Sequence, residues 1–247
     1  MQKKASFQLN ILFLLFLAPT YLIAEEFIIP IYDHHQPPLV LFNQGEASGI
    51  YIDLFREILI RANIESTFVV VPKKRARMMF EEGDSLISCC DNPAWRTRPK
   101  EQKVQLFSFA FYNTKDIFIF PKGKKFSIDD LSSLTTKSVA VIRGYGYRGS
   151  EWFGERNDFG GEYDLLKFIS LGRADVGIVN HDVAKRWVLE NGSKIELGSY
   201  HDIASLHVRV HRKRQNLLPN INQAISSIIS DGTREEIIGR YLSSPTD

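Results

Sequence analysis

The sequence has little cysteine, and this scarcity restricts both its fold and its chemistry. Its 247 residues include two cysteines, the adjacent Cys89 and Cys90. They could form a vicinal disulfide or remain as two thiols, but neither state closes a long loop, so the fold must rest on its hydrophobic core. Two neighbouring thiols without further cysteines or a converging histidine are also an incomplete zinc site.

An excess of charge of one sign is also lacking. The chain has 31 basic and 29 acidic residues. Lys3 and Lys4 lie in the first 24 residues, which contain no acid; removing these two leaves 29 basic residues, equal to the 29 acidic ones. A nucleic-acid-binding domain would need a basic face on a net positive domain. We therefore expect no nucleic-acid partner.

Beyond the N-terminus, no apolar run approaches the length of about 20 residues that a membrane helix needs. The N-terminus is typical of a secretory signal, with Lys3 and Lys4 as its charged region, residues 11–17 as its apolar core and Ala24 before the cut. No cysteine at the cut is available to accept a lipid. We therefore predict a signal peptide over residues 1–24, a mature chain that begins near Glu25, and release into a periplasm.

The histidines do not form a recognisable metal site. His207 and His211 are four residues apart in an alternating segment typical of a strand. Four strand residues span about 13 Å, which is too far to share one zinc ion. His34 and His35 follow Asp33, and three consecutive side chains do not easily converge on one ion. We expect neither a metal site nor a cofactor.

Common catalytic motifs are lacking as well. There is no G-x-S-x-G elbow and no zinc-protease motif, and the glycine-rich segment at residues 143–149 lacks the P-loop lysine and the full dinucleotide fingerprint. Backbone N–H groups at such a strand-to-helix turn can still hold an anion, which makes Arg143 and Tyr145 candidates for a binding site. No catalytic residue is predicted.

What is present is an alternation of short apolar runs with segments of helical spacing. Leu54, Phe55, Ile58 and Leu59 share one face of a predicted amphipathic helix. The expected order is strand 27–31, helix 54–62, strand 68–71, helix 75–82 and strand 85–88. This order implies a parallel sheet with crossover helices, so the fold class is α/β.

The rest of the chain continues the alternation. Apolar runs at residues 107–112 and 117–120 bracket a turn-like segment at 113–116, and Ser127 with Asp130 three residues later is typical of a helix start. The later expected elements are strand 138–142, helix 162–171, strand 174–179, helix 181–189, strands 194–197 and 206–211, and helices 221–229 and 234–242.

A polar loop after strand 85–88 is where we first expect a ligand. Beyond Cys89 and Cys90 it carries Asp91, Asn92, Trp95 and Arg96. Hydrogen-bonding groups, an aromatic ring and a guanidinium group of this kind fix small polar molecules. The alternative is an ordinary polar connection.

Several motifs resemble those of one family. Pro37 and Pro38 precede G-I-Y-I-D-L at residues 49–54, F-S-F-A-F-Y at 107–112 precedes a strand, L-G-R-A-D-V occupies 171–176, and the tail contains D-G-T at 231–233. These motifs are similar to those of the type II periplasmic solute-binding proteins of the amino-acid-binding kind (family 3). The similarity covers essentially all of the chain after the signal peptide.

The resemblance implies a two-lobed periplasmic-binding-protein-like fold, in which each lobe is a mainly parallel sheet flanked by helices. Two crossover strands would form the hinge, with residues 25–117 plus 208–247 in lobe one and 118–207 in lobe two. It further implies a monomer that captures a small polar solute, an amino acid or a related small carboxylate, between closing lobes. The closed form would be presented to a membrane ABC permease or a sensor.

The family's two charged anchors are missing from their usual places. Counting back six residues from Phe107, where the family has the arginine that holds a carboxylate, gives Glu101. Counting eight residues on from Gly172, where the family has the aspartate that holds an ammonium group, gives Asn180. Arg96 and Arg98 in the same loop, and Arg75, are the substitutes that we consider for the carboxylate clamp, and Arg75 and Arg96 enter the predicted site.

Asp182 and Asp91 are candidates for a cation, although an aspartate at a helix start such as Asp182 is equally typical of a cap that faces water. Aromatic residues at predicted strand ends complete the set. The predicted ligand-binding residues are Tyr32, Arg75, Asp91, Asn92, Trp95, Arg96, Tyr112, Arg143, Tyr145 and Asn180.

Two other functions stay open. One enzyme, cyclohexadienyl dehydratase, shares this fold and needs no metal, so an exported dehydratase of the prephenate type is the first alternative. The second is a protein that has lost its ligand and acts through protein contacts, because both usual anchors are absent.

Overall fold

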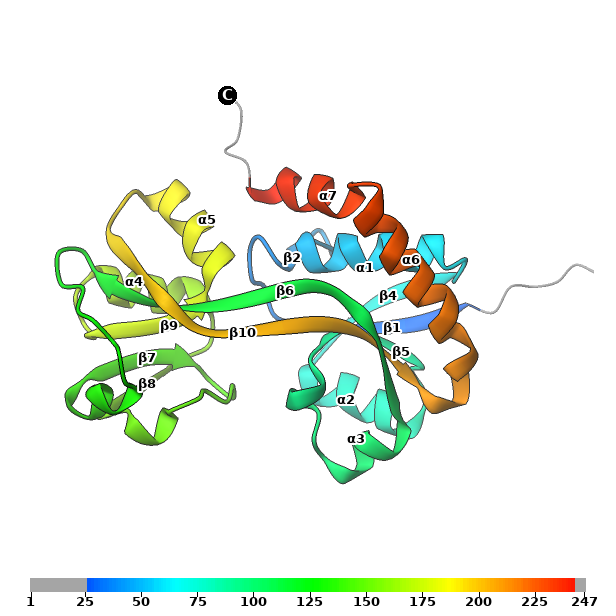
Figure 1. Ribbon diagram of the computed structural model, residues 1–247, viewed down its shortest axis with the longest axis horizontal. Coiled ribbons are helices and arrows are strands. Elements are labelled where there is room, and N and C mark those ends of the chain that lie inside the picture. The colour runs from blue at the N-terminus through cyan, green and yellow to red at the C-terminus, as the bar shows by residue number, and fades with distance from the viewer. Residues whose placement is uncertain (1–25, 243–247) are drawn as a thin grey trace, which may run out of the picture.

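The computed structural model describes residues 26–242, and the predicted signal peptide lies outside them. Two groups of helices and strands lie side by side and are joined by two long strands (Figure 1). We call the group that contains β1, β4 and α1 the first lobe, and the group that contains β7, β8 and β9 the second lobe. The predicted two-lobed α/β fold is confirmed.

The strands are β1 Phe27–Tyr32, β2 Leu41–Asn43, β3 Glu46–Ser48, β4 Ser66–Val71, β5 Ile87–Asp91, β6 Gln105–Pro121, β7 Ser138–Ile142, β8 Glu155–Phe159, β9 Val176–Asn180 and β10 Ile195–His211. The α-helices are α1 Ile50–Arg61, α2 Lys73–Glu82, α3 Pro99–Val104, α4 Glu162–Ser170, α5 His181–Asn191, α6 Leu218–Ser230 and α7 Thr233–Leu242.

In the first lobe, β1 and β4 pair in parallel from Phe27 opposite Ser66 to Tyr32 opposite Val71. Helix α1 provides the crossover between them and buries its apolar face, as its spacing predicts. Gly49 precedes this helix with a φ of 107°, and a Cβ there would lie 2.6 Å from the carbonyl oxygen of Leu39. Only glycine fits this entry to α1 without strain.

The long strands β6 and β10 run antiparallel to each other, from Gln105 opposite His211 to Pro121 opposite Ile195. Strand β5 pairs with β10 at the first-lobe end, and β9 pairs with β6 at the second-lobe end. Parallel pairing of β7 with both β8 and β9 completes the order β5-β10-β6-β9-β7-β8. One mixed sheet therefore passes through both lobes.

The turn expected at residues 113–116 is wrong, because this segment lies inside β6. Asn113 is opposite Ser205, and Asp116 is opposite Asp202. The polar residues mark the stretch of the strand that runs between the two lobes, not a reversal of the chain. The exact lobe boundaries at 117/118 and 207/208 remain a prediction, since both strands continue across them.

The C-terminal helices return to the first lobe. Arg61 at the end of α1 donates hydrogen bonds to Ser227 Oγ and Thr233 Oγ1, both at 2.8 Å, and is paired with Asp231. Ile221, Ala224, Ile225 and Ile228 form the buried face of α6. Helices α6 and α7 therefore pack beside α1.

Three local expectations differ from the structure. The helix expected from Ser127 is a 3-10 helix at Leu131–Thr136, because the Ser127 hydroxyl bonds to Asp129 whereas Asp130 accepts from the N–H of Ser132 and caps the later turn. Strand β8 and helix α3 were not predicted, since both are short and strongly polar. The strand expected at 85–88 lies at Ile87–Asp91.

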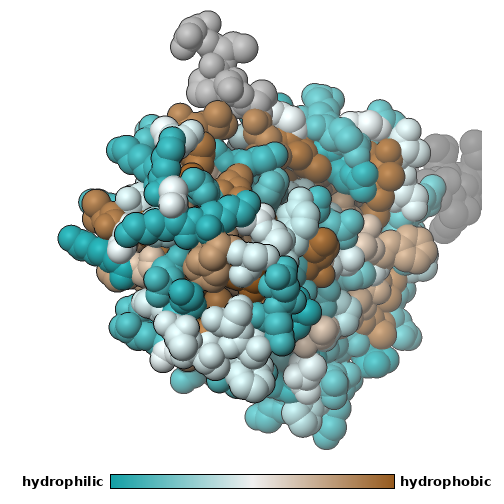
Figure 2. Space-filling model, turned by 60° about the vertical axis from the view of Figure 1, so that its left-hand side comes forward, coloured by the Kyte–Doolittle hydropathy of each residue, from teal (hydrophilic) through white to brown (hydrophobic). Residues whose placement is uncertain are grey.

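Within residues 26–242, no helix is long and apolar enough to span a membrane. The face that Figure 2 brings forward consists mainly of hydrophilic side chains, with small separate hydrophobic areas. A continuous hydrophobic band is not seen on that face.

Candidate functional site

Strand β5 ends at Asp91, the first of the predicted site residues, and Asp91 is buried. Its Oδ1 accepts a hydrogen bond of 2.6 Å from Arg96 Nε. Arg96 is also buried and donates from Nη2 to the hydroxyl of Tyr32 at 2.9 Å. Burial alone would lower the pKa of Arg96, but the Asp91 carboxylate raises it above its ordinary value. Arg96 is thus fixed and charged beside the carboxyl end of β1.

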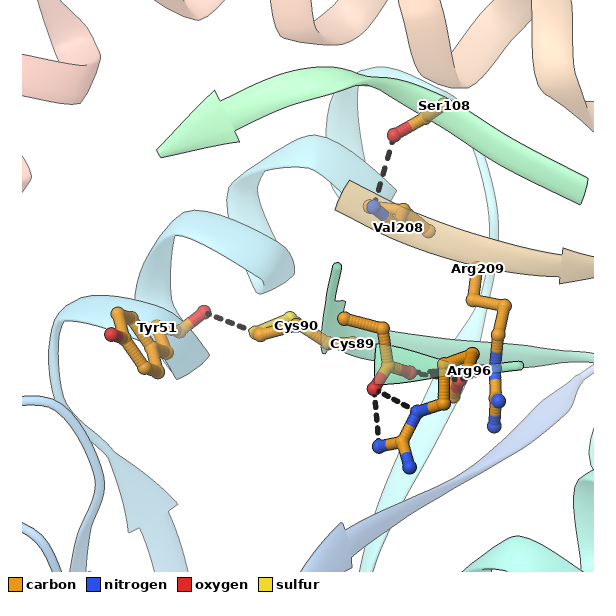
Figure 3. Close-up of a disulfide and its surroundings, with 9 residues drawn as sticks. Tyr51, Cys89, Cys90, Arg96, Ser108, Val208 and Arg209 are labelled. Atoms are coloured by element: carbon orange, nitrogen blue, oxygen red, sulfur yellow. Dashed lines mark hydrogen bonds and ion pairs between the residues drawn. A yellow bond between two sulfur atoms is a disulfide. The ribbon is translucent and has the colours of Figure 1, made fainter. Parts of the chain in front are cut away.

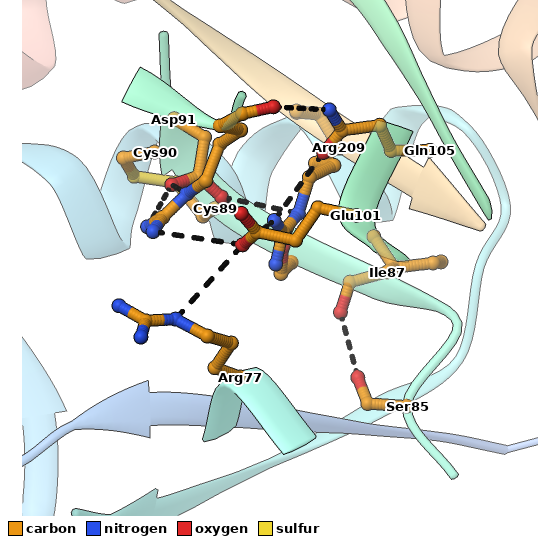
Figure 4. Close-up of polar contacts among 12 residues, drawn as sticks. Arg77, Ser85, Ile87, Cys89, Cys90, Asp91, Glu101, Gln105 and Arg209 are labelled. Atoms are coloured by element: carbon orange, nitrogen blue, oxygen red, sulfur yellow. Dashed lines mark hydrogen bonds and ion pairs between the residues drawn. A yellow bond between two sulfur atoms is a disulfide. The ribbon is translucent and has the colours of Figure 1, made fainter. Parts of the chain in front are cut away.

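Asp91 belongs to a larger cluster of buried charges in the first lobe (Figure 4). Its Oδ2 lies 3.3 Å from Arg209 Nε, and Arg209 Nη1 lies 3.3 Å from Glu101 Oε1. Arg77 Nε and Arg96 Nη1 each lie 3.9 Å from the same Glu101 oxygen. Two carboxylates therefore face three guanidinium groups, and the cluster has a net positive charge.

Glu101 does not take the place of the family's clamp arginine. It lies on α3, an unpredicted helix that stands between Arg96 and Phe107. The position six residues before Phe107 therefore lies inside this helix. The buried carboxylate of Glu101 holds arginine side chains there. Arg96, nearer to the end of β5, is the arginine that the fold fixes at the predicted position of the ligand.

The adjacent cysteines form a disulfide on β5 (Figure 3). The Sγ atom of Cys90 lies 4.0 Å from the carbonyl oxygen of Tyr51 on α1. Cys89, Cys90 and Asp91 were expected in a loop, but they extend the strand. The disulfide therefore lies between α1 and the charged cluster.

Tyr51 connects the first lobe to the long strand β6. Its hydroxyl donates to Thr114 Oγ1 at 2.8 Å, and its ring packs edge-on against Tyr112 with 5.4 Å between centroids. Asn180 Nδ2 donates to the same Thr114 oxygen at 2.8 Å. Tyr112 donates to Asp182 Oδ2 at 2.6 Å. Side chains from both lobes thus meet around Thr114.

A second set of contacts joins the loop after β1 to the second lobe. Gln36 Nε2 donates to Glu162 Oε1 at 2.6 Å, and His34 Nε2 lies 3.3 Å from Glu162 Oε2. Lys73 at the start of α2 places Nζ 4.6 Å from the centroid of the Tyr145 ring. Burial, followed by Arg96 and Arg77, lowers the pKa of Lys73.

Asp116 on β6 completes this region, which we call the lobe interface. Burial raises its pKa to about 7, and the negative charges of Asp202 and Glu162 add to the increase. Burial and the charge of Glu162 likewise raise the pKa of Tyr145. Asp116 and Glu162 therefore make one side of the interface acidic, whereas Lys73 and the buried cluster make the first-lobe side positive.

The predicted site residues fall into three groups. Those that lie at the lobe interface or in the adjoining cluster are Tyr32, Asp91, Arg96, Tyr112, Tyr145 and Asn180. Asn92 instead accepts from Ala94 N at 2.8 Å and donates to Ser205 O at 2.8 Å, which holds the turn after β5. Exposed residues without a demonstrated role in the interface are Arg75, Trp95 and Arg143.

Asn180 also has a structural role. Its Oδ1 accepts hydrogen bonds from the N–H groups of Asp182 and Val183 and caps α5. Its Nδ2 donates to Thr114, so both ends of the side-chain amide have protein partners and the acceptor oxygen is used by the helix. Asn180 therefore does not replace the aspartate that the family uses for an ammonium group.

Sequence reasoning missed Tyr51, Lys73, Asp116 and Glu162. Asp116 had a visible signal, since it is a lone acid that directly precedes the apolar run 117–120. Tyr51 lies inside a motif used for the resemblance, but Lys73 and Glu162 gave no signal distinct from ordinary helix-start residues. Among residues 26–242, no group of three or more His, Cys, Asp or Glu side chains could hold a metal ion.

Comparisons with known proteins cover nearly the whole of the described chain. The model of the bacterial extracellular solute-binding proteins, family 3, matches residues 28–244. No curated protein sequence matches the chain significantly.

Solved structures with the same fold share little sequence with this chain. A mutant of ArgBP from T. maritima is 17% identical with a TM-score of 0.68, covering 87% of this chain and 94% of that one. The second substrate binding domain of a putative amino acid ABC transporter from Streptococcus pneumoniae is 18% identical with a TM-score of 0.63, covering 88% and 100%. A histidine kinase sensor domain with similarity to periplasmic binding proteins is 15% identical with a TM-score of 0.72, covering 89% and 97%.

Proposed function

Because this chain belongs to family 3 of the bacterial extracellular solute-binding proteins, we propose that it captures a small solute with a carboxylate group, an amino acid or a related compound, between its two lobes. One observation carries the proposal: Lys73 of the first lobe lies against the Tyr145 ring of the second lobe, and Arg96, which Asp91 and Tyr32 hold in the first lobe, adds a second positive charge near Lys73. A guanidinium and a partly desolvated ammonium together suit a carboxylate.

Local structure explains why these cations lie there. Tyr32 ends β1, and Lys73 begins α2 directly after β4, so both stand at the carboxyl ends of parallel strands. Ligands of open α/β sheets bind in this place. Asp91 and Tyr32 orient the Arg96 guanidinium before any ligand arrives, which lowers the cost of ordering it on binding.

Closure of the lobes would bring the solute into contact with both sides. Strands β6 and β10 are the described segments that pass through both lobes and are the proposed hinge. Once buried, the charges of the solute interact with fixed groups in a medium of low dielectric constant, where these interactions are stronger than in water. We assign the closed form to a membrane partner, an ABC permease or a sensor, and the protein to the periplasm.

Thermal unfolding of the purified protein against a panel of solutes tests the proposal. The panel contains the L-amino acids, small carboxylates, polyamines, sugars and prephenate, the last also assayed for turnover. A ligand at 100 times its dissociation constant adds about 2.7 kcal/mol, which raises the midpoint by roughly 2–4 °C per kcal/mol for a protein of this size.

We expect a shift with an amino acid or a small carboxylate and no turnover of prephenate. A shift with sugars or polyamines alone would refute the carboxylate assignment. Turnover of prephenate would establish the dehydratase alternative, and no shift with any compound would favour a protein that acts through protein contacts.

A further inference from the structure

Asp116 has a defined position at the lobe interface. Within β6 it follows Thr114 by two residues, so both side chains point to the same face of the strand. Thr114 accepts hydrogen bonds from Tyr51 and Asn180. Asp116 therefore faces the side of β6 at which the first lobe reaches the second, and its charge contributes to raising the pKa of Tyr51.

Despite this position, Asp116 has no counter-ion in the part of the chain that the structure describes. Among residues 26–242, no side chain or backbone group forms a hydrogen bond or ion pair with its carboxylate. The charged neighbours that raise its pKa, Asp202 and Glu162, are both negative. A desolvated carboxylate without a partner is costly, and a cationic group of a ligand would relieve that cost.

Glu162 provides an independent sign of a missing partner. Its side chain is 2% exposed, as the first residue of α4 it points toward the first lobe, and Oε1 accepts from Gln36. Its Oε2 atom is buried and accepts no hydrogen bond from a described residue, although His34 Nε2 lies 3.3 Å away. Buried carboxylate oxygens in folded proteins normally have a donor.

The Tyr145 ring lies near Glu162, because the ring of His34, whose Nε2 is 3.3 Å from Glu162 Oε2, has its centroid 6.3 Å from that of Tyr145. Burial and then Glu162 and Asp116 raise the pKa of Tyr145. The Tyr145 ring already receives the ammonium group of Lys73, 4.6 Å from its centroid, so this ring is placed where cationic groups meet the lobe interface. Carboxylates beside aromatic faces are the usual surroundings of a bound ammonium group.

We propose that Asp116 and Glu162 form the subsite for a primary ammonium group of the solute, with Tyr145 beside it. This inference rests on the proposed function and narrows it, because the solute would then be a zwitterion whose carboxylate meets Lys73 and Arg96. The subsite takes over the role for which Asn180 is unsuited. Asp116 is accordingly the residue that sets specificity for amino compounds over their deaminated acids.

Calorimetric titration of three variants tests the subsite with the L-amino acid that most raises the midpoint of the wild-type protein. The variants are Asp116→Asn, Glu162→Gln and, as control, Asp164→Asn, an exposed carboxylate on the same helix as Glu162. Truncating one partner of a buried charge pair costs a binding interface several kcal/mol. We expect affinity to fall at least about 30-fold in Asp116→Asn, to fall less in Glu162→Gln, and to stay unchanged in Asp164→Asn.

The deaminated analogue of the same amino acid distinguishes a binding role of Asp116 from a structural one, because a structural defect would weaken the binding of both compounds. Its affinity should be the same for the wild-type protein and Asp116→Asn, because it brings no ammonium group. If Asp116→Asn binds the amino acid as tightly as wild type, or weakens both compounds equally, the subsite is refuted while the proposed function stands.

A ligand-free measurement separates failure of the subsite from failure of the proposed function. If no amino acid binds the wild-type protein, the proposed function fails. The inference about Asp116 is then tested without ligand, by comparing the thermal unfolding midpoints of the wild-type protein and Asp116→Asn at pH 8. A higher midpoint in Asp116→Asn supports an uncompensated carboxylate that awaits a cation. An equal or lower midpoint overturns the inference.

Discussion

Two groups of buried charges differ in how completely the protein itself pairs them. In the first lobe, the carboxylates of Asp91 and Glu101 each face guanidinium groups of Arg77, Arg96 or Arg209, although the buried Nε of Arg77 forms no hydrogen bond. At the lobe interface, the half-buried Asp116 has no hydrogen bond or ion pair with any residue of the described range 26–242, and Glu162 has one buried oxygen without a hydrogen bond there. The first group therefore stabilises the fold and orients Arg96, whereas the second is available to a ligand. Burial alone does not distinguish a structural charge from a binding charge, but the presence of partners does.

The largest effect should come from breaking the paired cluster. In Arg209→Ala, both carboxylates lose a partner on a strand that connects the lobes, and Phe80 loses the guanidinium group 3.9 Å from its ring centroid. Removing one partner of a buried pair costs about 3–5 kcal/mol. Urea unfolding should show this loss, and Arg212→Ala, on the exposed turn after β10, should not. A loss below about 1 kcal/mol would mean that the cluster is not structural.

Neutralising the unpaired carboxylate of Asp116 should stabilise the protein, whereas Arg209→Ala destabilises it. The pKa of Asp116 in the folded protein, about 7, lies above its ordinary value of 3.8, so the unfolded chain ionises first and wild-type stability falls as the pH rises between these values. Asp116→Asn lacks this penalty. Its free energy of unfolding should equal that of the wild-type protein near pH 3 and exceed it by on the order of 2–4 kcal/mol above pH 7.

Urea unfolding from pH 3 to pH 8 measures this difference, with Asp164→Asn as the matched variant whose difference should stay flat. A curve for Asp116→Asn that runs parallel to wild type over the whole range would show that Asp116 is compensated after all.

A third change probes the cationic side of the interface. Lys73→Gln removes the ammonium group beside Tyr145, and we expect the affinity for the solute to fall about tenfold, or about 1.4 kcal/mol. Lys74→Gln, the exposed neighbour on the same helix, should bind like wild type. Equal affinities of the two variants, measured by titration, would remove Lys73 from the site.

The smallest effect should come from Asn180, which we regard as structural. Asn180→Ala removes the cap of α5 and should cost about 1 kcal/mol of stability, with little change in affinity. Asn180→Ser, which can still cap the helix, should recover most of the loss in thermal unfolding. A large loss of affinity in both variants would restore Asn180 to the ligand site.

Much of the fold could be predicted from the sequence, because apolar spacing and glycine positions determine which segments form helices and strands. The buried face of α1 is an example. Predictions failed where polar residues occupy regular structure, at residues 113–116 inside β6 and in the helix α3. In both places, pairing or ion pairs across the fold compensate for a local pattern that is typical of a loop.

The site was predicted only in part, since a sequence does not show which charges have partners. Arg96 was among the candidates, but its pairing with Asp91 depends on the strand register at the end of β5. Lys73 and Glu162 resemble ordinary helix-start residues until the lobes bring them opposite Tyr145 and Gln36. Long-range contacts of this kind leave no periodic signal.

The most direct test of the charge arrangement compares three solutes by titration: the amino acid that binds best, its deaminated acid and its decarboxylated amine. Each analogue lacks one charge of the zwitterion. We predict that the amino acid binds at least about 30-fold more tightly than either analogue. Equal affinity for the amino acid and the deaminated acid would contradict the account, because the carboxylates of Asp116 and Glu162 would then contribute nothing to recognition.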